Sequence, residues 1–159
     1  MTSDSSANRV DISSENLEPP SWTGNLRRYA SAVLRELSIT YWEVSILLTD
    51  DERMRELNAT YRSIDEPTDV LSFSTTPDGD SMTIGDGAFR CAGDIVINVP
   101  MIERQAKEWY ATPEEELRRM MVHGLLHLAG HTHQSNDFAE EPMLRLQEAI
   151  LDTVEERIY

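Results

Sequence analysis

Residues 112–133 read Thr-Pro-Glu-Glu-Glu-Leu-Arg-Arg-Met-Met-Val-His-Gly-Leu-Leu-His-Leu-Ala-Gly-His-Thr-His and contain all 4 histidines of the chain. The segment opens with a strong helix start, because Thr112 and Glu115 form a capping box and Pro113 takes the first helical position. We therefore expect a helix that begins near residue 112 and carries the first two histidines toward a common site.

The histidines have the spacing of a metal site. His123 and His127 lie on one face of the expected helix, one turn apart. Gly130 can end that helix in a left-handed conformation, so that a third imidazole reaches the first two. Three convergent imidazoles with an open fourth position are the catalytic form of a zinc site. The spacing, which is that of metzincin proteases, predicts one Zn²⁺ per chain held by His123, His127 and His133, with His131 as the alternative third ligand.

One position departs from the protease pattern. Metalloproteases carry a glutamate directly after the first histidine as the general base, whereas this chain has Gly124 there. Peptide hydrolysis is therefore a less favoured alternative. Because three histidines are neutral ligands, the bound metal keeps its full charge, can generate hydroxide near neutral pH and attracts anionic substrates such as phosphates.

Composition places the chain among globular proteins. Its 159 residues suit one domain, and 40% of them are hydrophobic. No apolar run approaches the roughly 20 residues that a membrane-spanning helix needs, and the first residues lack the regions of a secretory signal. We expect no membrane association. Cys91 is the single cysteine, so an internal disulfide is excluded and the cytoplasm is the expected location.

The net charge of −15 opposes nucleic-acid binding, since affinity for phosphates comes largely from Lys and Arg. Two features reduce this objection. Lys107 is the single lysine among 14 basic residues, so the others are arginines, which bind phosphate in a bidentate fork. A local basic patch can also outweigh the global sum. The acidic charge still suits a protein that binds basic proteins better than bare RNA.

Periodicity predicts an α+β fold. We expect residues 1–9 to form a disordered tail and residues 10–159 to form one domain. Helices are expected over residues 22–37, 49–61, 100–110, 141–157 and from 112 through both histidines; strands are expected over 42–48, 69–73 and 93–99, with a short edge strand at 10–12 and a loop over 75–92. The predicted architecture is a small mixed sheet of three to four strands, flanked by about five helices and including a zincin-like metal helix.

A second segment identifies a family. Residues 57–73 read Leu-Asn-Ala-Thr-Tyr-Arg-Ser-Ile-Asp-Glu-Pro-Thr-Asp-Val-Leu-Ser-Phe, and residues 93–95 read Gly-Asp-Ile. Together with the histidine run, they closely resemble the YbeY family of bacterial single-strand-specific endoribonucleases, which act in rRNA maturation and ribosome quality control. The resemblance covers residues 40–155, with the motifs in the same order.

The resemblance implies roles for individual residues. His123, His127 and His133 match the three zinc ligands of the family, and Arg62 matches an arginine that faces the metal cleft and is needed for activity. It further implies cleavage of single-stranded RNA at the small-subunit rRNA 3′ end. The implied partners are rRNA, the small ribosomal subunit and its assembly proteins, without DNA. Either water or the 2′-hydroxyl of the substrate is the nucleophile. The acidic charge favours one alternative, a ribosome-associated assembly factor with a structural zinc and weak or no nuclease activity.

The chemistry of arginine suits this role, since its fixed donors stabilise charge on phosphate oxygens. The alternative is that Arg62 pairs with a nearby carboxylate and holds the loop. The carboxylates considered for that pairing are Asp65, Glu66 and Asp69. We expect Asp65, Asp69 and also Asp94 to be structural residues that cap or hydrogen-bond loops.

The chain departs from the family at one place. The family usually has Gly-Tyr-Asp-His where this chain has Gly130-His131-Thr132-His133. Thr132 supplies no carboxylate near the third ligand. If the family aspartate orients that ligand, metal affinity or activity is altered here.

Overall fold

The computed structural model describes residues 8–75, 83–84, 89–133, 135, 137 and 140–159. Its helices are α1 (Thr23–Glu36), α2 (Asp51–Arg62), α3 (Val99–Glu108), α4 (Pro113–Leu128) and α5 (Pro142–Thr153). Its strands are β1 (Arg9–Ser14), β2 (Trp42–Thr49), β3 (Val70–Ser74), β4 (Thr83–Ile84) and β5 (Phe89–Asn98). None of these helices is long and apolar enough to cross a bilayer.

The sheet is mixed, as the sequence predicts. Its order is β1-β2-β5-β3, and β4 pairs with one end of β5. The strands β1, β2 and β5 are parallel, whereas β3 runs antiparallel to β5 and is the last strand of this order. The mixed sheet and the five helices of the described residues confirm the predicted α+β class and the predicted number of helices.

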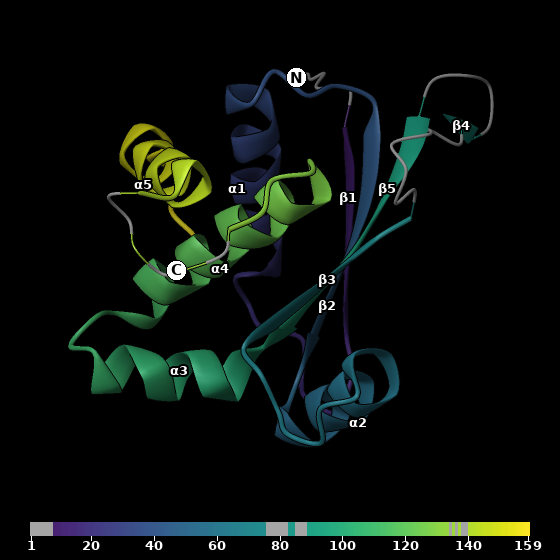
Figure 1. Cartoon of the computed structure of the whole chain (residues 1–159), viewed down its shortest axis with the longest axis vertical. Helices are drawn as coiled ribbons and strands as arrows, with labels where there is room; N and C mark the ends of the chain where they lie inside the picture. The colour runs from purple at the N-terminus through teal and green to yellow at the C-terminus, as the bar shows by residue number, and fades with distance from the viewer. Residues whose placement is uncertain (1–7, 76–82, 85–88, 134, 136, 138–139) are drawn as a thin grey trace.

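The helices form layers on the two faces of the sheet (Figure 1). On one face, α1 contacts β1 and α4 contacts β3 and β5, while α3 and α5 pack against α4. On the other face, α2 contacts β5. The main core lies between the sheet and α1 and α4, where the alternate β2 residues Val44, Ile46 and Leu48 are buried. A second, smaller core of Met54, Leu71 and Val96 lies under α2.

The largest differences from the sequence prediction lie in the final helix and in the predicted loop 75–92. The predicted final helix 141–157 ends at Thr153, because the segment after it returns to α4: Arg118 donates to the Val154 carbonyl at 2.7 Å, and the buried Ile158 donates its amide to Glu114 at 2.6 Å. The predicted loop 75–92 instead contains β4 and the start of β5, since pairing with β2 extends β5 toward its N-terminus. The rest of that loop, residues 76–82 and 85–88, lies outside the described residues.

The division into a tail of residues 1–9 and a domain of residues 10–159 stays a prediction. Residues 1–7 lie outside the described residues, and Arg9 is the first residue of β1.

Close approach of β3 and β5 requires a glycine. Gly93 has φ +144, and a Cβ there would collide with the carbonyl oxygen of Phe73 on β3. We expect Gly93→Ala to lower the free energy of unfolding by about 2–4 kcal/mol, because it adds both strain and overpacking. Urea denaturation measures this change.

Gly24 is the matched control. It lies in the first turn of α1, and a Cβ there would meet nothing within 4 Å. Gly24→Ala should leave the stability unchanged or raise it by up to roughly 1 kcal/mol. Equal effects of the two substitutions would contradict the assignment of Gly93 as a close-packing position.

Candidate metal centre

Local sequence signals position α4 and the turn after it. The capping box is present, since Thr112 Oγ1 accepts from the Glu115 amide at 3.1 Å and Glu115 Oε1 accepts from the Thr112 amide at 2.9 Å. Gly130 has φ +97, and the His131 amide donates back to the Leu126 carbonyl at 3.0 Å. The predicted glycine turn is therefore present and returns the chain toward the last turns of α4.

The turn brings three imidazoles together. His123, His127 and His133 each offer a nitrogen, and these nitrogens all lie within 4.8 Å of one another. The Nε2 atoms of His123 and His127 are 3.0 Å apart. The group formed by the described residues includes His133 and not His131, which agrees with the spacing argument for the third ligand.

The tautomer of His123 follows from its neighbours on α5. The Gln147 amide nitrogen donates to Glu148 at 3.2 Å, so its Oε1 faces His123, whose Nδ1 lies 2.7 Å away. The amide oxygen is an acceptor, so Nδ1 of His123 carries the proton and Nε2 keeps its lone pair. Gln147 is only 2% exposed, which fixes this arrangement.

The other two imidazoles are held in a similar way. His133 Nδ1 lies 2.9 Å from the Ser135 carbonyl oxygen, and His127 hydrogen-bonds to the backbone of His131. Ser135 is itself tied to Glu141 through its amide and its hydroxyl, at 3.2 and 3.0 Å. Since carbonyl oxygens accept, the Nδ1 of His133 is a donor and its Nε2 is free to bind a metal.

This arrangement fits a metal ion. When Nδ1 donates, the Nε2 lone pairs of His123 and His127 face each other at 3.0 Å, which is repulsive unless a cation lies between them. Nitrogens bound to tetrahedral zinc at about 2.0–2.1 Å lie roughly 3.3 Å apart. The donor set and its spacing therefore suit a zinc-like ion, and the role of these residues as ligands stays a prediction.

The third imidazole is supported although this chain has Thr132 where the family has an aspartate. Thr132 is exposed, and the Ser135 carbonyl provides the acceptor for His133 Nδ1. His131 contributes through its backbone to the orientation of His127. A backbone acceptor thus provides the support that the family aspartate would give if it orients the third ligand.

The site lowers the affinity of His123 and His127 for protons. Burial lowers the pKa of His127 to about 4, and the neighbouring His123 and His133 add to this effect. Burial also lowers the pKa of His123, against the opposing effect of its bond to Gln147. Both rings are therefore neutral at pH 7, which is the form that binds a metal.

Arg62 lies at the same pocket. A cavity of about 670 Å³ is lined by residues that include His123, His127, Arg62 and Asp69. Arg62 is the last residue of α2, and its Nη2 donates to the Ser72 carbonyl on β3 at 2.8 Å. Asp65, one of the carboxylates considered as a partner of Arg62 in the alternative, is bound by Arg55 instead, at 2.8 Å. The guanidinium is thus held by a backbone oxygen and faces the pocket.

Two expected structural carboxylates have local partners. Asp69 Oδ1 accepts from the Val70 amide at 2.7 Å at the start of β3, and Asp65 binds Arg55. Asp94 differs, because it lies exposed in the middle of β5 rather than in a loop.

Gly124 faces the sheet at a close contact between α4 and β5. A Cβ at this position would lie 3.1 Å from two carbons of the Ile95 side chain on β5. A side chain at position 124 would therefore require Ile95 to move by a few tenths of an ångström. The glycine leaves the position of the protease glutamate without a carboxylate.

Sequence reasoning did not identify Gln147. The sequence did contain a signal for it, since Gln147 is a polar residue on the apolar side of the final helix. It lies four residues after the buried Met143 and three before the buried Ile150. A buried polar side chain in such a stripe needs a partner, and His123 is that partner. Ser135 gave no comparable signal because it acts through its backbone.

We expect Gln147→Leu to weaken metal binding by roughly 10- to 100-fold, since it removes the acceptor that orients His123. Gln147→Glu keeps an acceptor and should bind metal at least as tightly as the wild type. Competition with a coloured chelator measures the affinity. An unchanged affinity in Gln147→Leu, with its fold intact by circular dichroism, would show that the contact does not orient the ligand.

The lowered pKa of His127 predicts a pH effect on the metal-free protein. Between its ordinary pKa of 6.5 and its folded value of about 4, the unfolded chain binds a proton that the folded chain does not. Stability should therefore fall as the pH falls through this window and should level off below it. Urea denaturation at several pH values measures the slope, and His127→Gln should reduce it. A slope that this substitution leaves unchanged would contradict the shift.

The chain is similar to known proteins over nearly its whole length. The family model described as Endoribonuclease YbeY matches residues 9–155. An endoribonuclease YbeY of Treponema pallidum is 41% identical over 147 residues, which cover 92% of this chain and 90% of that protein. The relative from Sulfurihydrogenibium is 39% identical over 152 residues and covers 96% of both chains.

A solved structure shows the same fold. The solution structure of a Thermotoga maritima protein matches with a TM-score of 0.61 at 26% identity, covering 91% of this chain and 88% of that one. Fold, metal-site motif and sequence similarity agree, and the chain belongs to the endoribonuclease YbeY family.

Proposed function

We propose that this chain is a zinc-dependent endoribonuclease that cuts single-stranded RNA during maturation of the small-subunit rRNA 3′ end and in ribosome quality control. The observation that carries the proposal is the shared pocket of about 670 Å³, where two of three convergent imidazoles lie with the guanidinium of Arg62. Family membership supports the reaction class, since the named relatives are endoribonucleases.

The donor set supports zinc. His123, His127 and His133 would hold the ion through Nε2, and an all-imidazole site suits Zn²⁺ better than Mg²⁺ or Ca²⁺, which prefer oxygen ligands. When bound, zinc supplies a Lewis acid that polarises a phosphoryl oxygen and makes water more acidic. The side of the site that opens into the pocket leaves room for substrate.

Arg62 performs the electrostatic part of the reaction. Its Nη2 is held by the Ser72 carbonyl, so the guanidinium is fixed while its other donors remain for a phosphate. These donors bind the non-bridging oxygens, where negative charge grows during cleavage. The fixed position removes the need to order the side chain when the substrate binds.

The acidic surface affects how the protein would reach its RNA substrate. The net charge of −15 repels RNA at long range, so we propose that basic proteins of the small ribosomal subunit and its assembly factors help to bring the enzyme to rRNA. The cytoplasmic location expected from the single cysteine belongs to the same proposal. The alternative, an assembly factor with a structural zinc, rests on this charge alone.

The test uses purified protein, a labelled single-stranded RNA and elemental analysis. We expect about one zinc per chain, with the metal lost in His127→Ala. Arg62→Ala should keep its zinc but lose about 10²–10³-fold in kcat, because it removes donors to the developing charge. Arg62→Lys should recover part of this loss.

Arg55→Ala is the matched control, since Arg55 is an exposed arginine on the same helix that binds Asp65. It should cleave RNA as the wild type does.

A cyclic phosphate on the product would assign the 2′-hydroxyl as nucleophile, and its absence would assign water. If the zinc-loaded wild type binds ribosomal proteins but cuts no RNA, the assembly-factor alternative is correct.

A further inference from the structure

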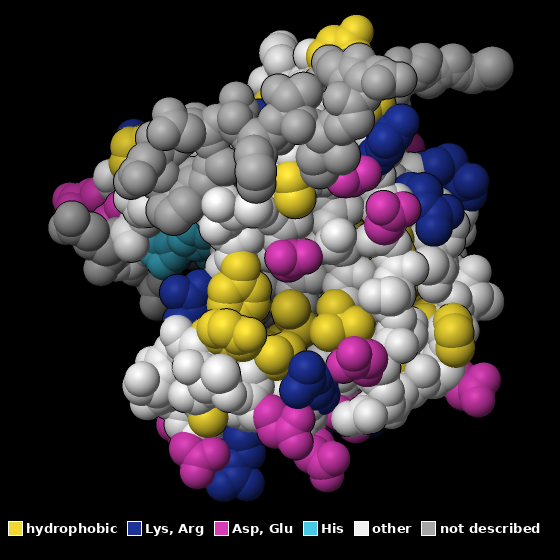
Figure 2. All heavy atoms as spheres, turned by 90° about the vertical axis from the view of Figure 1, so that its right-hand side faces the viewer, with side chains coloured by type: hydrophobic (Ala, Val, Ile, Leu, Met, Phe, Trp, Pro, Cys, Tyr) yellow, Lys and Arg dark blue, Asp and Glu magenta, His cyan; other side chains and the backbone are white. Residues whose placement is uncertain are grey.

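The face of the sheet that carries α2 is only partly covered by that helix. α2 ends at Arg62, and Ser63 turns the chain away with φ +61. In Figure 2, which views this side of the molecule, hydrophobic side chains gather at the centre of the face, and the histidine side chains lie next to them. The described helices thus leave an apolar surface beside the metal centre.

This surface contains a second pocket of about 320 Å³, within the size range of small-molecule sites. Its lining residues are Leu47, Leu57, Tyr61, Phe73, Asp94 and Val96. Tyr61 and Phe73 form an edge-to-face pair, with centroids 5.3 Å apart. The Tyr61 side is open to solvent, because this residue is 63% exposed. An exposed aromatic face above an apolar floor is the arrangement that stacks a flat ring.

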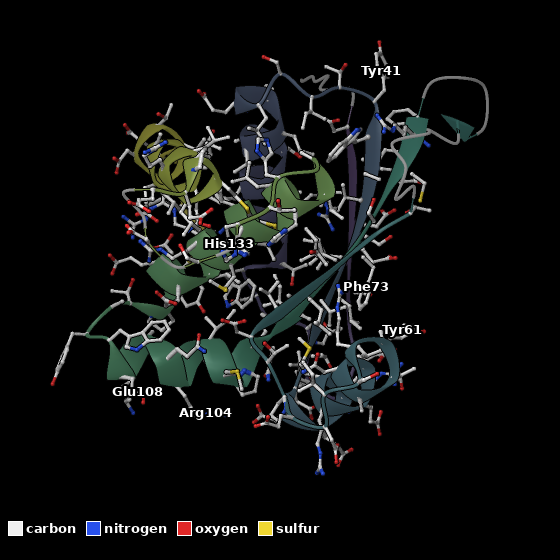
Figure 3. All side chains as sticks on the ribbon, viewed as in Figure 1. Tyr41, Tyr61, Phe73, Arg104, Glu108 and His133 are labelled. Atoms are coloured by element: carbon white, nitrogen blue, oxygen red, sulfur yellow. The ribbon has the colours of Figure 1, made fainter. Side chains whose placement is uncertain are left out.

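The second pocket adjoins the metal pocket across β3. Phe73 lines both cavities, and in the view of Figure 3 it lies between His133 and Tyr61. The Arg62 guanidinium lies 5.2 Å from the centre of the Phe73 ring and also binds the Ser72 carbonyl. Arg62 therefore places a cation in the metal pocket, near the ring that both cavities share. A phosphate that links two nucleotides would lie there.

The second pocket also contains a carboxylate, that of Asp94 on β5. Asp94 is directly opposite Phe73 in the β3–β5 register, so the two side chains share this face of the sheet. Within the described part of the chain, the Asp94 carboxylate has neither a hydrogen bond nor an ion pair. Burial raises its pKa. A ligand with N–H donors would satisfy this carboxylate.

We propose that this second pocket binds one unpaired nucleobase of the RNA substrate. The base stacks on Tyr61 and Phe73, its N–H groups donate to Asp94, and the adjoining phosphate lies against Arg62 at the metal centre. The inference rests on the proposed function and names its substrate subsite. Because a base in a duplex is stacked and paired and cannot enter, the pocket provides a physical reason for a single-strand preference.

The pocket favours particular bases. An ionised carboxylate only accepts hydrogen bonds. Guanine presents two adjacent N–H donors to it, whereas uracil presents one donor between two carbonyl oxygens, which Asp94 repels. We therefore expect guanine to bind this position more tightly than uracil.

The test uses a single-stranded oligoribonucleotide with 2-aminopurine at successive positions, whose fluorescence is quenched when the base stacks. At one position the wild type should quench the signal. Tyr61→Ala should abolish this quenching and weaken RNA binding by roughly 5- to 150-fold, with zinc content unchanged. Tyr61→Phe keeps the ring and should restore both. Tyr110→Ala is the matched control, because Tyr110 is 99% exposed and lies between α3 and α4.

Asp94→Ala tests the base preference. It should reduce the difference in affinity between guanine and uracil at the quenched position, while stacking persists.

If Tyr61→Ala binds and quenches like the wild type, the base site is wrong although the nuclease proposal stands. If Tyr61→Ala loses binding to ribosomal proteins but not to RNA, the pocket takes a protein side chain instead and the inference fails. A wild type that neither binds nor cuts RNA overturns the proposed function as well.

Discussion

The contact of Gly124 with Ile95 sets the position of the whole site. Because residue 124 has no side chain, α4 lies directly on β5. His123 and His127, on the same helix, then line the pocket beside β3. Arg62 reaches the same pocket from the opposite face of the sheet, through its bond to Ser72. A larger residue at position 124 would require Ile95 or α4 to shift. The absence of a glutamate has a chemical consequence, since the reaction must rely on the metal and on Arg62.

The electrostatics of the molecule depend on neutral ligands. A chain with net charge −15 has little general affinity for RNA. His123 and His127 add no charge at pH 7, because burial lowers the pKa of both, that of His127 to about 4. A bound ion would then keep both of its charges and act with Arg62 as a local positive centre. An acidic surface around such a centre favours substrates delivered to it over random nucleic acid, which suits an enzyme whose uncontrolled activity would damage RNA.

Patterns local in sequence predicted the features that depend on neighbouring residues. The capping box, the spacing of His123 and His127, and the turn at Gly130 are each determined within a few residues, and the structure has all of them. Features that depend on distant packing were missed. Gln147 meets His123 across 24 residues, and the last helix ends early because Ile158 is buried against α4. The early start of β5 likewise depends on its pairing with β2.

The position of β3 at the edge of the sheet explains how one substrate could use both faces. An interior strand would be flanked by neighbours, and a flexible chain could not pass from one face to the other around it. At β3, the backbone carbonyl of Ser72 binds Arg62, and Phe73 lines the cavity on each side. Asp94 was expected to be a structural residue, yet it lies in mid-strand on the face away from the histidines, opposite Phe73. Asp94 is exposed, yet partial burial among apolar neighbours raises the pKa of its carboxyl group. A neutral or apolar residue would avoid this desolvation, so the carboxylate is consistent with a role in recognition.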